Sequence, residues 1–353
     1  MQALRWHGNG DLRLEETPKP TAERPDDVVI EVEVCGICGT DVHEYVHGPQ
    51  MIRTAEHPLT GARPPITLGH EFAGYVSSVG SHVDDLEIGQ LVTVDPCLRC
   101  GDCAACQRGD YHICAQGGSI GLAADGGLAD FVVVPRVNVI AVPDGVPAVW
   151  AAVAEPLAVG LHAARRAGVG AGDTVLITGA GPIGIASLLG AISLGAGAVF
   201  VSEPSAARAQ LALHVGATEV FDPLTVDVRR EVFLRSGRVG PDRAIEATGR
   251  PEAFELGLTS LRRGGRLSIA GITDSALTFP LRQLVLYERE VVGSLGYNRD
   301  IERVLQLMAT GRLDPGPFVK TVRPLSQAPD TFANLSAGPA DELKILLSPA
   351  KDI

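Results

Sequence analysis

The chain has 353 residues, a formal net charge of −12 and 45% hydrophobic residues. This length and hydrophobic content suffice for more than one domain, each with its own core. The lysines and arginines are scattered rather than clustered, which argues against a nucleic-acid-binding or anionic-membrane-binding surface. We therefore expect a protein of at least two domains that binds neither nucleic acid nor membrane.

The N-terminal residues MQALRWHGNGDLRLEE carry charges and lack an apolar stretch, so they do not resemble a secretory signal peptide. One uncharged segment, 175–201, has the length of a membrane span. The sequences GAGPIG and SLGAGA interrupt it, and each remaining piece is too short to cross a bilayer. We interpret the segment as a strand, a helix and a second strand, and expect a cytoplasmic protein with reduced thiols.

Two short stretches near the N-terminus contain candidate metal ligands. The alternating residues VIEVEV at 29–34 predict a strand, which ends in a glycine-punctuated turn containing Cys38. His70 and Glu71 follow a glycine further along the chain. A thiolate, an imidazole and a carboxylate suit zinc, and three protein ligands leave a fourth position open. The alternative is that Cys35 and Cys38 are core cysteines and that the second stretch is an ordinary turn.

A dense group of cysteines comes next. Residues 97–114 read CLRCGDCAACQRGDYHIC, and four of these cysteines follow the pattern C-x2-C-x2-C-x7-C: Cys100, Cys103, Cys106 and Cys114. In a reducing compartment such spacing favours a metal site, and four thiolates complete a tetrahedron without an open position, as in structural zinc. An iron–sulfur cluster or a redox dithiol is the alternative. Cys97 is left outside the pattern.

Glu155 is a single acid in the apolar run WAAVAEPLAVGLHAAR. A buried carboxylate is unfavourable unless something compensates its charge. A metal cation would do so, and Glu155 is therefore a further candidate ligand.

Residues 174–203 predict a strand, a glycine-rich turn, a helix and a second strand ending at Glu203. The turn has the form G-x-G-x-x-G and comprises Gly179, Gly181, Pro182, Ile183 and Gly184. Such glycines let a pyrophosphate approach the helix N-terminus, and the acid accepts hydrogen bonds from the adenosine ribose. Because Glu203 would repel a 2′-phosphate, we expect NAD(H). An ordinary βαβ unit is the alternative.

Strands and helices continue to alternate after residue 173. We expect helices at 183–194 and 205–215, followed by strands at RAIEAT and GRLSIAG. This alternation predicts an α/β fold with a doubly wound parallel sheet.

The stretches CGICGTDVH, LGHEFAG, the four-cysteine segment, AEPLAVGLHA and TGAGPIG, in this order, resemble the zinc-dependent medium-chain alcohol and polyol dehydrogenases. The resemblance covers nearly the whole chain. It implies a mostly β GroES-like catalytic domain at 1–156, completed by 296–353, and a Rossmann NAD-binding domain at 157–295. It also implies a zinc-binding lobe at about 96–115 and two zinc ions per subunit, one catalytic and one structural.

The resemblance assigns roles to individual residues. Cys38 and His70 match catalytic zinc ligands, and Asp41 matches the acid that orients the histidine. Glu71 and Glu155 match carboxylates at that zinc, and which of them touches the metal directly stays open.

Three further matches concern the proton and the cofactor. Thr40 and His43 match a relay that carries the alcohol proton to solvent, although His43 could instead be an ordinary surface imidazole. Arg208 matches a basic residue that contacts the adenosine ribose. The implied reaction interconverts an alcohol and a ketone by hydride transfer with NAD.

The proline-rich loop between His43 and His70 indicates a branch of the family. HEY, GP and HPLTG resemble the 2,3-butanediol (acetoin) dehydrogenases, as do GSIGLAADGGLADFVVVP and VVGSLGYN. Two acids at the zinc, one more than a simple alcohol needs, could bind the second oxygen of a vicinal diol or hydroxyketone. Sorbitol-like polyols and simple secondary alcohols are alternatives. The loop could also merely cover the site or form an oligomer contact, and we expect His47 and His57 at the surface.

Two other classes of protein are alternatives. A zinc-stapled binding module without catalysis is disfavoured by the net charge and the nucleotide fingerprint. A zinc-free quinone-type reductase would lack Cys38, His70 and the cysteine lobe. The resemblance also implies a homodimer or homotetramer, for which we expect contact through Rossmann-domain edges such as the RLSIAG region.

Overall fold

The computed structural model describes residues 1–273, 275–276, 278, 281–338 and 342–350. The chain divides into two compact units, one formed by Met1–Glu155 and Phe318–Ile353 and the other by Pro156–Pro317. We expected residues 296–317 in the catalytic domain, but they fall in the second unit. There, helix α10 (Asp300–Ala309) is joined to α4 (Ala154–Ala167) by a 2.8 Å hydrogen bond between His162 and Asp300.

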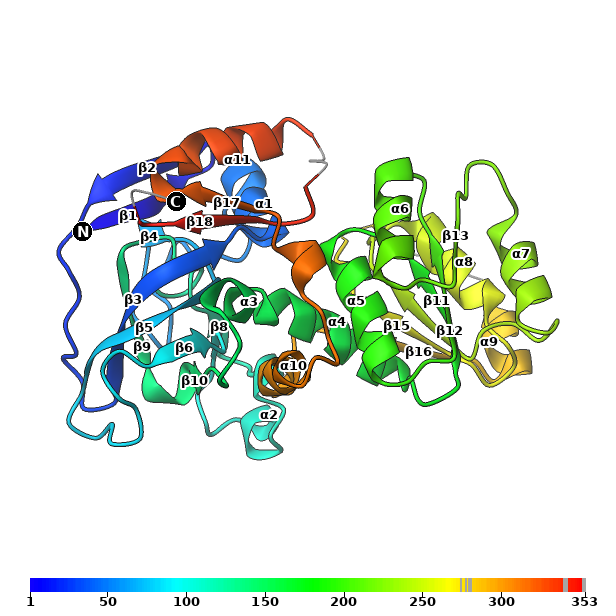
Figure 1. The fold of residues 1–353 in the computed structure, drawn as a ribbon, viewed down its shortest axis with the longest axis horizontal. Coiled ribbons are helices and arrows are strands. Elements are labelled where there is room, and N and C mark those ends of the chain that lie inside the picture. The colour runs from blue at the N-terminus through cyan, green and yellow to red at the C-terminus, as the bar shows by residue number, and fades with distance from the viewer. Residues whose placement is uncertain (274, 277, 279–280, 339–341, 351–353) are drawn as a thin grey trace. The chain divides into compact units, whose positions relative to one another are not determined.

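The first unit is mostly β-structure. Its largest sheet has the strand order β10-β6-β5-β3-β18-β17, and β9 also pairs with β3. The bounds are β3 (Asp27–Gly36), β5 (Glu71–Val79), β6 (Leu91–Val94), β9 (Phe131–Pro135), β10 (Val139–Ala141), β17 (Thr321–Pro324) and β18 (Ile345–Ser348). Strand β18 pairs antiparallel with β3, so segments from both ends of the chain complete one sheet (Figure 1).

Smaller elements surround this sheet. A three-stranded sheet has the order β2-β1-β4, and β7 pairs with β8. These strands are β1 (Gln2–Gly8), β2 (Asp11–Glu16), β4 (Ile66–Thr67), β7 (Cys97–Leu98) and β8 (Gly118–Ser119). The α-helices of the unit are α1 (Gly39–His47), α2 (Ala104–Gln107), α3 (Ala148–Ala152) and α11 (Ala328–Ser336).

Strand β3 follows from the alternation seen in the sequence. Glu31 and Glu33 are exposed, whereas Val32 and Val34 between and after them are buried. Alternate side chains of a strand point to opposite faces, so the valines enter the core while the acids face solvent.

The second unit contains a six-stranded parallel sheet of order β13-β12-β11-β14-β15-β16. Its strands are β11 (Thr174–Thr178), β12 (Ala198–Ser202), β13 (Glu219–Phe221), β14 (Arg243–Glu246), β15 (Arg266–Ile269) and β16 (Glu290–Gly293). Its helices, besides α4 and α10, are α5 (Pro182–Ser193), α6 (Ala206–Val215), α7 (Val228–Arg235), α8 (Pro251–Ser260) and α9 (Leu281–Tyr287). The strand order reverses beside β11, which is where doubly wound folds bind dinucleotides.

This sheet confirms the predicted fold class and the interpretation of segment 175–201, which forms β11, α5 and β12. Among the described residues, no helix has the length and apolar character needed to span a membrane. One expectation was wrong. The RLSIAG region forms β15, which lies between β14 and β16, so within the described residues the sheet edges are β13 and β16.

Candidate zinc and cofactor sites

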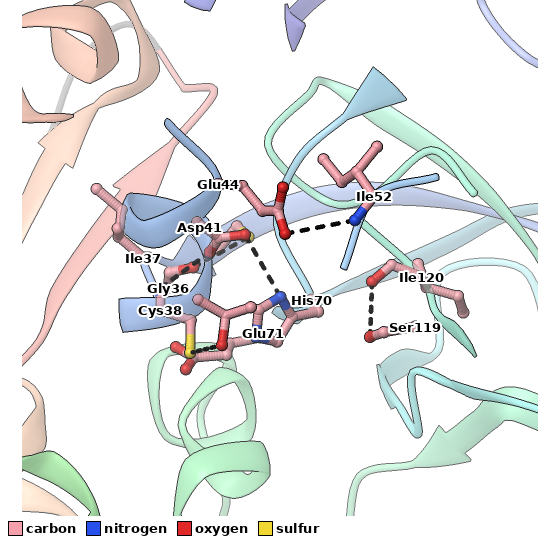
Figure 2. A network of polar contacts seen from close by, with 12 residues as sticks. Gly36, Ile37, Cys38, Asp41, Glu44, Ile52, His70, Glu71, Ser119 and Ile120 are labelled. Atoms are coloured by element: carbon pink, nitrogen blue, oxygen red, sulfur yellow. Dashed lines mark hydrogen bonds and ion pairs between the residues drawn. The ribbon is translucent and has the colours of Figure 1, made fainter. Parts of the chain in front are cut away.

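The pairing of β3 with β5 brings the catalytic candidates together. Gly36 lies opposite Glu71 in this antiparallel pair, so the turn after β3 meets the residue that precedes β5. The candidate ligand atoms of Cys38, His70 and Glu71 all lie within 4.8 Å of one another (Figure 2). His70 and Glu71 are buried and Cys38 is half-buried. A thiol, an imidazole and a carboxylate at this separation fit a zinc ion.

Asp41 orients this group from the first turn of α1. Its carboxylate accepts a 2.9 Å hydrogen bond from the N–H of Cys38, and its other oxygen lies 3.5 Å from Nδ1 of His70. Burial alone lowers the pKa of His70, but Asp41 and Cys38 raise it well above the usual histidine value. With Nδ1 facing an acid, Nε2 is the nitrogen available to a metal, as in carboxylate–histidine–zinc arrangements.

The two relay candidates lie on the same helix. The hydroxyl of Thr40 lies 3.7 Å from Sγ of Cys38, and thus beside the candidate metal site. His43 is exposed, and its ring centroid lies 5.9 Å from that of the exposed His47. Thr40 therefore lies next to the ligands, while His43 is in contact with solvent.

Lys344 lies at the candidate site but is not among the residues predicted from the sequence. Its ammonium group donates to both oxygens of Glu71 at 2.7 Å and to the carbonyl of Ile37 at 3.1 Å. Lys344 is 5% exposed and Glu71 is fully buried. Burial by itself lowers the pKa of Lys344. The charge and hydrogen bonds of Glu71, together with the charges of Cys38 and Glu155, raise it by more than burial lowers it, so the pKa lies above the ordinary lysine value.

The ion pair between Lys344 and Glu71 changes the interpretation of the two acids at the candidate zinc site. We expected Glu71 and Glu155 together to leave one acid free for the second oxygen of a diol. That argument was wrong, because Lys344 binds both oxygens of Glu71. Glu155 is buried in the first turn of α4, but among the described residues it is not in the group of ligand atoms within 4.8 Å.

The four predicted cysteines of the lobe lie together. Their sulfur atoms are within 4.8 Å of one another, with separations of 3.9 Å for Cys100–Cys106, 3.9 Å for Cys103–Cys114 and 3.4 Å for Cys100–Cys114. A tetrahedron with Zn–S bonds of about 2.3 Å has S–S edges of about 3.8 Å. Backbone N–H groups of Cys106 and Ala115 lower the pKa of Cys103 to about 6, which favours its thiolate. Cys97 lies outside the group, as expected.

The glycine-rich turn joins β11 to α5 in the predicted manner. Gly179 has a φ of +98°, a conformation that favours glycine, and Gly181 is the N-cap of α5. A Cβ atom at Gly184 would lie 2.0 Å from the carbonyl oxygen of Gly179. Helix α5 and the turn therefore approach each other too closely at Gly184 for any residue that has a side chain. Pro182 and Ile183 form the first turn of α5.

Glu203 lies at the end of β12, directly beside this turn. Its carboxylate accepts hydrogen bonds from the N–H of Ala180 at 2.7 Å and from the N–H of Ser205 at 2.9 Å. Arg208 is half-buried in the first turn of α6, and its N–H is bonded to the Ser205 hydroxyl. The turn, Glu203 and Arg208 thus belong to adjoining elements at the carboxyl end of the sheet.

The loop between α1 and β4 differs from expectation at one residue. We expected His57 at the surface, but it is 4% exposed and lies 3.4 Å from the carbonyl of Gly117. It packs between two chain segments and is not part of either candidate metal group among the described residues.

Two family models match the chain. The alcohol dehydrogenase GroES-like domain matches residues 24–144, and the zinc-binding dehydrogenase domain matches residues 182–310. The (R,R)-butanediol dehydrogenase of Neisseria gonorrhoeae is 35% identical over 99% of each chain. The L-threonine 3-dehydrogenase of Pyrococcus furiosus is 36% identical over 86% of this chain and 85% of its own. The sorbitol dehydrogenase of Bacillus subtilis is 31% identical over 99% of this chain and 97% of its own.

Solved structures agree with these matches. The 2R,3R-butanediol dehydrogenase of Bacillus subtilis superposes with a TM-score of 0.93, at 34% identity over 99% of both chains. A zinc-binding dehydrogenase of Sinorhizobium meliloti, bound to NADP, has a TM-score of 0.90 at 34% identity over 99% of both chains.

The chain therefore belongs to the zinc-dependent medium-chain dehydrogenases, a family of oxidoreductases with a GroES-like and a Rossmann-type domain. Within that family, both the sequence and the structure comparisons include butanediol dehydrogenases along the full chain, which confirms the branch indicated by the loop motifs.

Proposed function

We propose that the protein is an NAD(H)-dependent zinc dehydrogenase that interconverts a vicinal diol and its hydroxyketone, such as 2,3-butanediol and acetoin. The observation that carries the reaction class is the convergence of Cys38, His70 and Glu71, with the Thr40 hydroxyl 3.7 Å from Cys38. Butanediol as the substrate is supported by the loop motifs and by the butanediol dehydrogenases that match this chain over 99% of its length.

The residues of the first unit suit this reaction. A zinc ion at Cys38 and His70 would polarise the substrate oxygen and lower the pKa of the alcohol. Asp41 holds the imidazole of His70 in one orientation. The Oγ1 atom of Thr40 accepts the alcohol proton and passes it toward His43, whose exposed ring exchanges protons with solvent.

We propose that Glu155, rather than Glu71, is the carboxylate that completes the zinc ligands. The ammonium of Lys344 neutralises Glu71 and occupies both of its oxygens. Glu155 is buried and contributes to raising the pKa of Lys344, so its charge acts on the same region. Zinc titration of Glu155→Gln and Glu71→Gln tests this choice. We expect the larger loss of affinity in Glu155→Gln, and the reverse order would assign the ligand to Glu71.

NAD is the proposed cofactor because a buried carboxylate, Glu203, adjoins the glycine-rich turn and would repel a 2′-phosphate. Its two oxygens also hold the N–H groups of Ala180 and Ser205, which fixes the charge in place. Arg208 in the next helix would contact the ribose. The cysteine lobe is proposed to hold a second, structural zinc ion, because four thiolates leave no position for a substrate.

A homo-oligomer formed through the second unit is proposed from an exposed sheet edge. Among the described residues β16 is an edge strand, and Leu286 and Leu295 nearby are more than half exposed, at 57% and 52%. Edge strands with exposed apolar neighbours pair readily with another chain. Sedimentation giving about twice or four times the 36.9 kDa chain mass supports an oligomer, and a monomer mass contradicts it.

The substrate is tested by initial rates with NAD on the stereoisomers of 2,3-butanediol, on 1,2-propanediol, sorbitol, threonine and 2-butanol. Acetoin and diacetyl are measured with NADH. We expect the highest specificity constant for a 2,3-butanediol isomer. A tenfold advantage for sorbitol, about 1.4 kcal/mol in transition-state binding, would instead favour the polyol alternative.

A further inference from the structure

Glu246 is a buried carboxylate at the carboxyl end of β14 that the proposed reaction does not use. Its side chain is 1% exposed. Its Oε1 atom accepts hydrogen bonds from the N–H of Thr248 at 2.7 Å, from the hydroxyl of Thr248 at 2.5 Å and from the N–H of Gly249 at 2.9 Å. The carboxylate therefore holds the turn that directly follows its own strand.

The turn 247–249 is also tied to the two neighbouring strands. The N–H of Ala247 bonds to the carbonyl of Thr178, the last residue of β11, at 3.1 Å. On the other side, the N–H of Gly271, just beyond β15, bonds to the carbonyl of Glu246 at 3.1 Å. A Cβ atom at Gly271 would lie 2.5 Å from Oε2 of Glu246. The carboxyl ends of β11, β14 and β15 thus meet around this one carboxylate.

The same turn touches the glycine-rich turn between β11 and α5. A Cβ atom at Gly179 would lie 2.4 Å from Cγ2 of Thr248, so this methyl group fills the space beside the first glycine of the G-x-G-x-x-G pattern. A Cβ atom at Gly184 would lie 3.9 Å from that of Ala247. Strands β11 and β14 are the neighbours between which the strand order reverses, and doubly wound folds bind dinucleotides in the crevice at that point. The turn 247–249 therefore lines this crevice on the β14 side.

Two buried glutamates thus flank the glycine-rich turn. Strands β12 and β14 are both neighbours of β11, and Glu203 and Glu246 lie at their carboxyl ends. Glu203 holds the N–H of Ala180 within the glycine-rich turn, whereas Glu246 holds Thr248 against that turn. Glu203 is proposed to face the adenosine ribose. Every hydrogen bond to Oε1 of Glu246 comes from the protein, so this second acid acts through the turn that it holds.

We infer that Glu246 is a positioning residue for the dinucleotide, because its carboxylate fixes the turn 247–249 as one side of the cofactor crevice. The inference rests on the proposed NAD(H) function and adds to it a residue that sets cofactor affinity without distinguishing NAD from NADP. Without an acceptor at this position, two backbone N–H groups and one hydroxyl lose their partner, and Thr248 is no longer held against Gly179. Binding of the cofactor must then order the turn, and this cost lowers the affinity.

The test compares three substitutions in the full chain. Glu246→Met replaces the carboxylate by an unbranched side chain without an oxygen acceptor, and Glu246→Gln keeps one acceptor oxygen. Glu252→Met is the matched control, because it removes an acid from the adjoining helix α8 that is 80% exposed. Dissociation constants of NADH and of NADPH are measured by fluorescence titration. Amide hydrogen exchange is followed at Thr248 and Gly249 in the cofactor-free protein.

In Glu246→Met we expect faster exchange at both N–H groups and dissociation constants of NADH and NADPH that both rise about tenfold. The value of kcat at saturating NAD should change by less than about twofold, because the turn does not touch the reacting atoms. Glu246→Gln should restore most of the affinity, since its amide oxygen can accept the same three hydrogen bonds. Glu252→Met should bind both cofactors as the wild type does.

The outcomes are separable. Unchanged dissociation constants in a folded Glu246→Met variant overturn the inference, and so does a Glu246→Gln variant that binds as weakly as Glu246→Met. A changed ratio of the NADH and NADPH constants also overturns it, because Glu246 would then act at the 2′ position, as Glu203 is proposed to do. A wild type that binds neither cofactor refutes the proposed function instead, while the exchange data still test the hold on the turn.

A second variant covers the case in which Glu246→Met fails to fold. Thr248→Val removes the hydroxyl that donates to Glu246 and keeps the methyl group beside Gly179. We expect both dissociation constants to rise about threefold in this variant. Constants equal to those of the wild type overturn the inference.

Discussion

Replacing Lys344 by methionine should destabilise the first unit strongly. The substitution keeps an unbranched side chain that is one atom shorter. It leaves the carboxylate of Glu71, which is fully buried, without the ammonium that now lies 2.7 Å from both of its oxygens. Breaking a buried ion pair by removing one partner costs about 3–5 kcal/mol, an approximately 150- to 5,000-fold change in the folding equilibrium. We expect a loss in this range for Lys344→Met.

Tryptophan fluorescence can follow the unfolding of the first unit separately. Both tryptophans, Trp6 and Trp150, lie in the first unit, so urea unfolding followed by tryptophan fluorescence reports on that unit alone. Metal-free protein is used because a bound cation could replace the lost positive charge. Lys320→Met, which removes an exposed lysine of the same unit, is the matched control and should change stability by no more than about 0.5 kcal/mol.

A double variant tests the pairing itself. Glu71→Gln combined with Lys344→Met leaves no uncompensated charge, so we expect it to be more stable than Lys344→Met by about 2 kcal/mol or more. Zinc should also restore part of the stability of Lys344→Met. A loss below about 1 kcal/mol in Lys344→Met, or a double variant no more stable than the single one, would refute the account of a buried charge pair.

Three further variants test other parts of the structure. Glu203→Ala should narrow the preference for NAD over NADP in initial rates, and equal rates of the wild type with both cofactors would contradict the role of this carboxylate. Cys100→Ser should lower the thermal unfolding temperature and remove one zinc ion, whereas Cys97→Ser, outside the cysteine group, should do neither. Asp300→Asn should destabilise the second unit by about 2–3 kcal/mol at pH 7, because His162, Arg165 and Arg303 donate to this fully buried carboxylate. Burial raises the pKa of Asp300, but these donors lower it well below the usual value, so its stabilisation is complete above about pH 4 and fades as the pH falls further. Calorimetry from pH 7 to pH 3 should show the difference between wild type and Asp300→Asn shrinking only below about pH 4.

The sequence predicts those parts of the site whose functional residues lie close together along the chain. Four cysteines within fifteen positions and a glycine-rich turn between two apolar strands need no distant partner to be recognised. Cys38 and His70 are further apart, but each lies in a short motif whose residue types suit a metal. Their convergence then depends on the register of β3 and β5, which only the structure supplies.

Lys344 could not be predicted in this way. It lies 273 residues from Glu71, directly before the apolar strand β18, and nothing in its neighbourhood indicates a buried partner. The same reason explains the mistaken use of Glu71 as a spare acid for a diol. His57 was misplaced because a histidine in a proline-rich loop suggests exposure, whereas contacts with residues 117–118 bury it.

The domain boundary near residue 296 differed from expectation for a comparable reason. Asp300 binds His162 over a separation of 138 residues, and this contact keeps α10 with the second unit. We likewise expected the edge of the parallel sheet at β15, whereas β16 lies beyond it. The short strand β16 has only exposed and half-buried residues, so its sequence lacks the hydrophobic pattern that predicts a strand.

The central claim is that one zinc site performs the chemistry and a second one holds the cysteine lobe together. Metal analysis of the purified protein, with oxidation of 2,3-butanediol measured on the same samples, tests it most directly. We predict about two zinc ions per subunit in the wild type and about one in a folded, inactive Cys38→Ser variant. A single ion in the wild type that Cys100→Ser retains, or full activity in Cys38→Ser, would contradict the account.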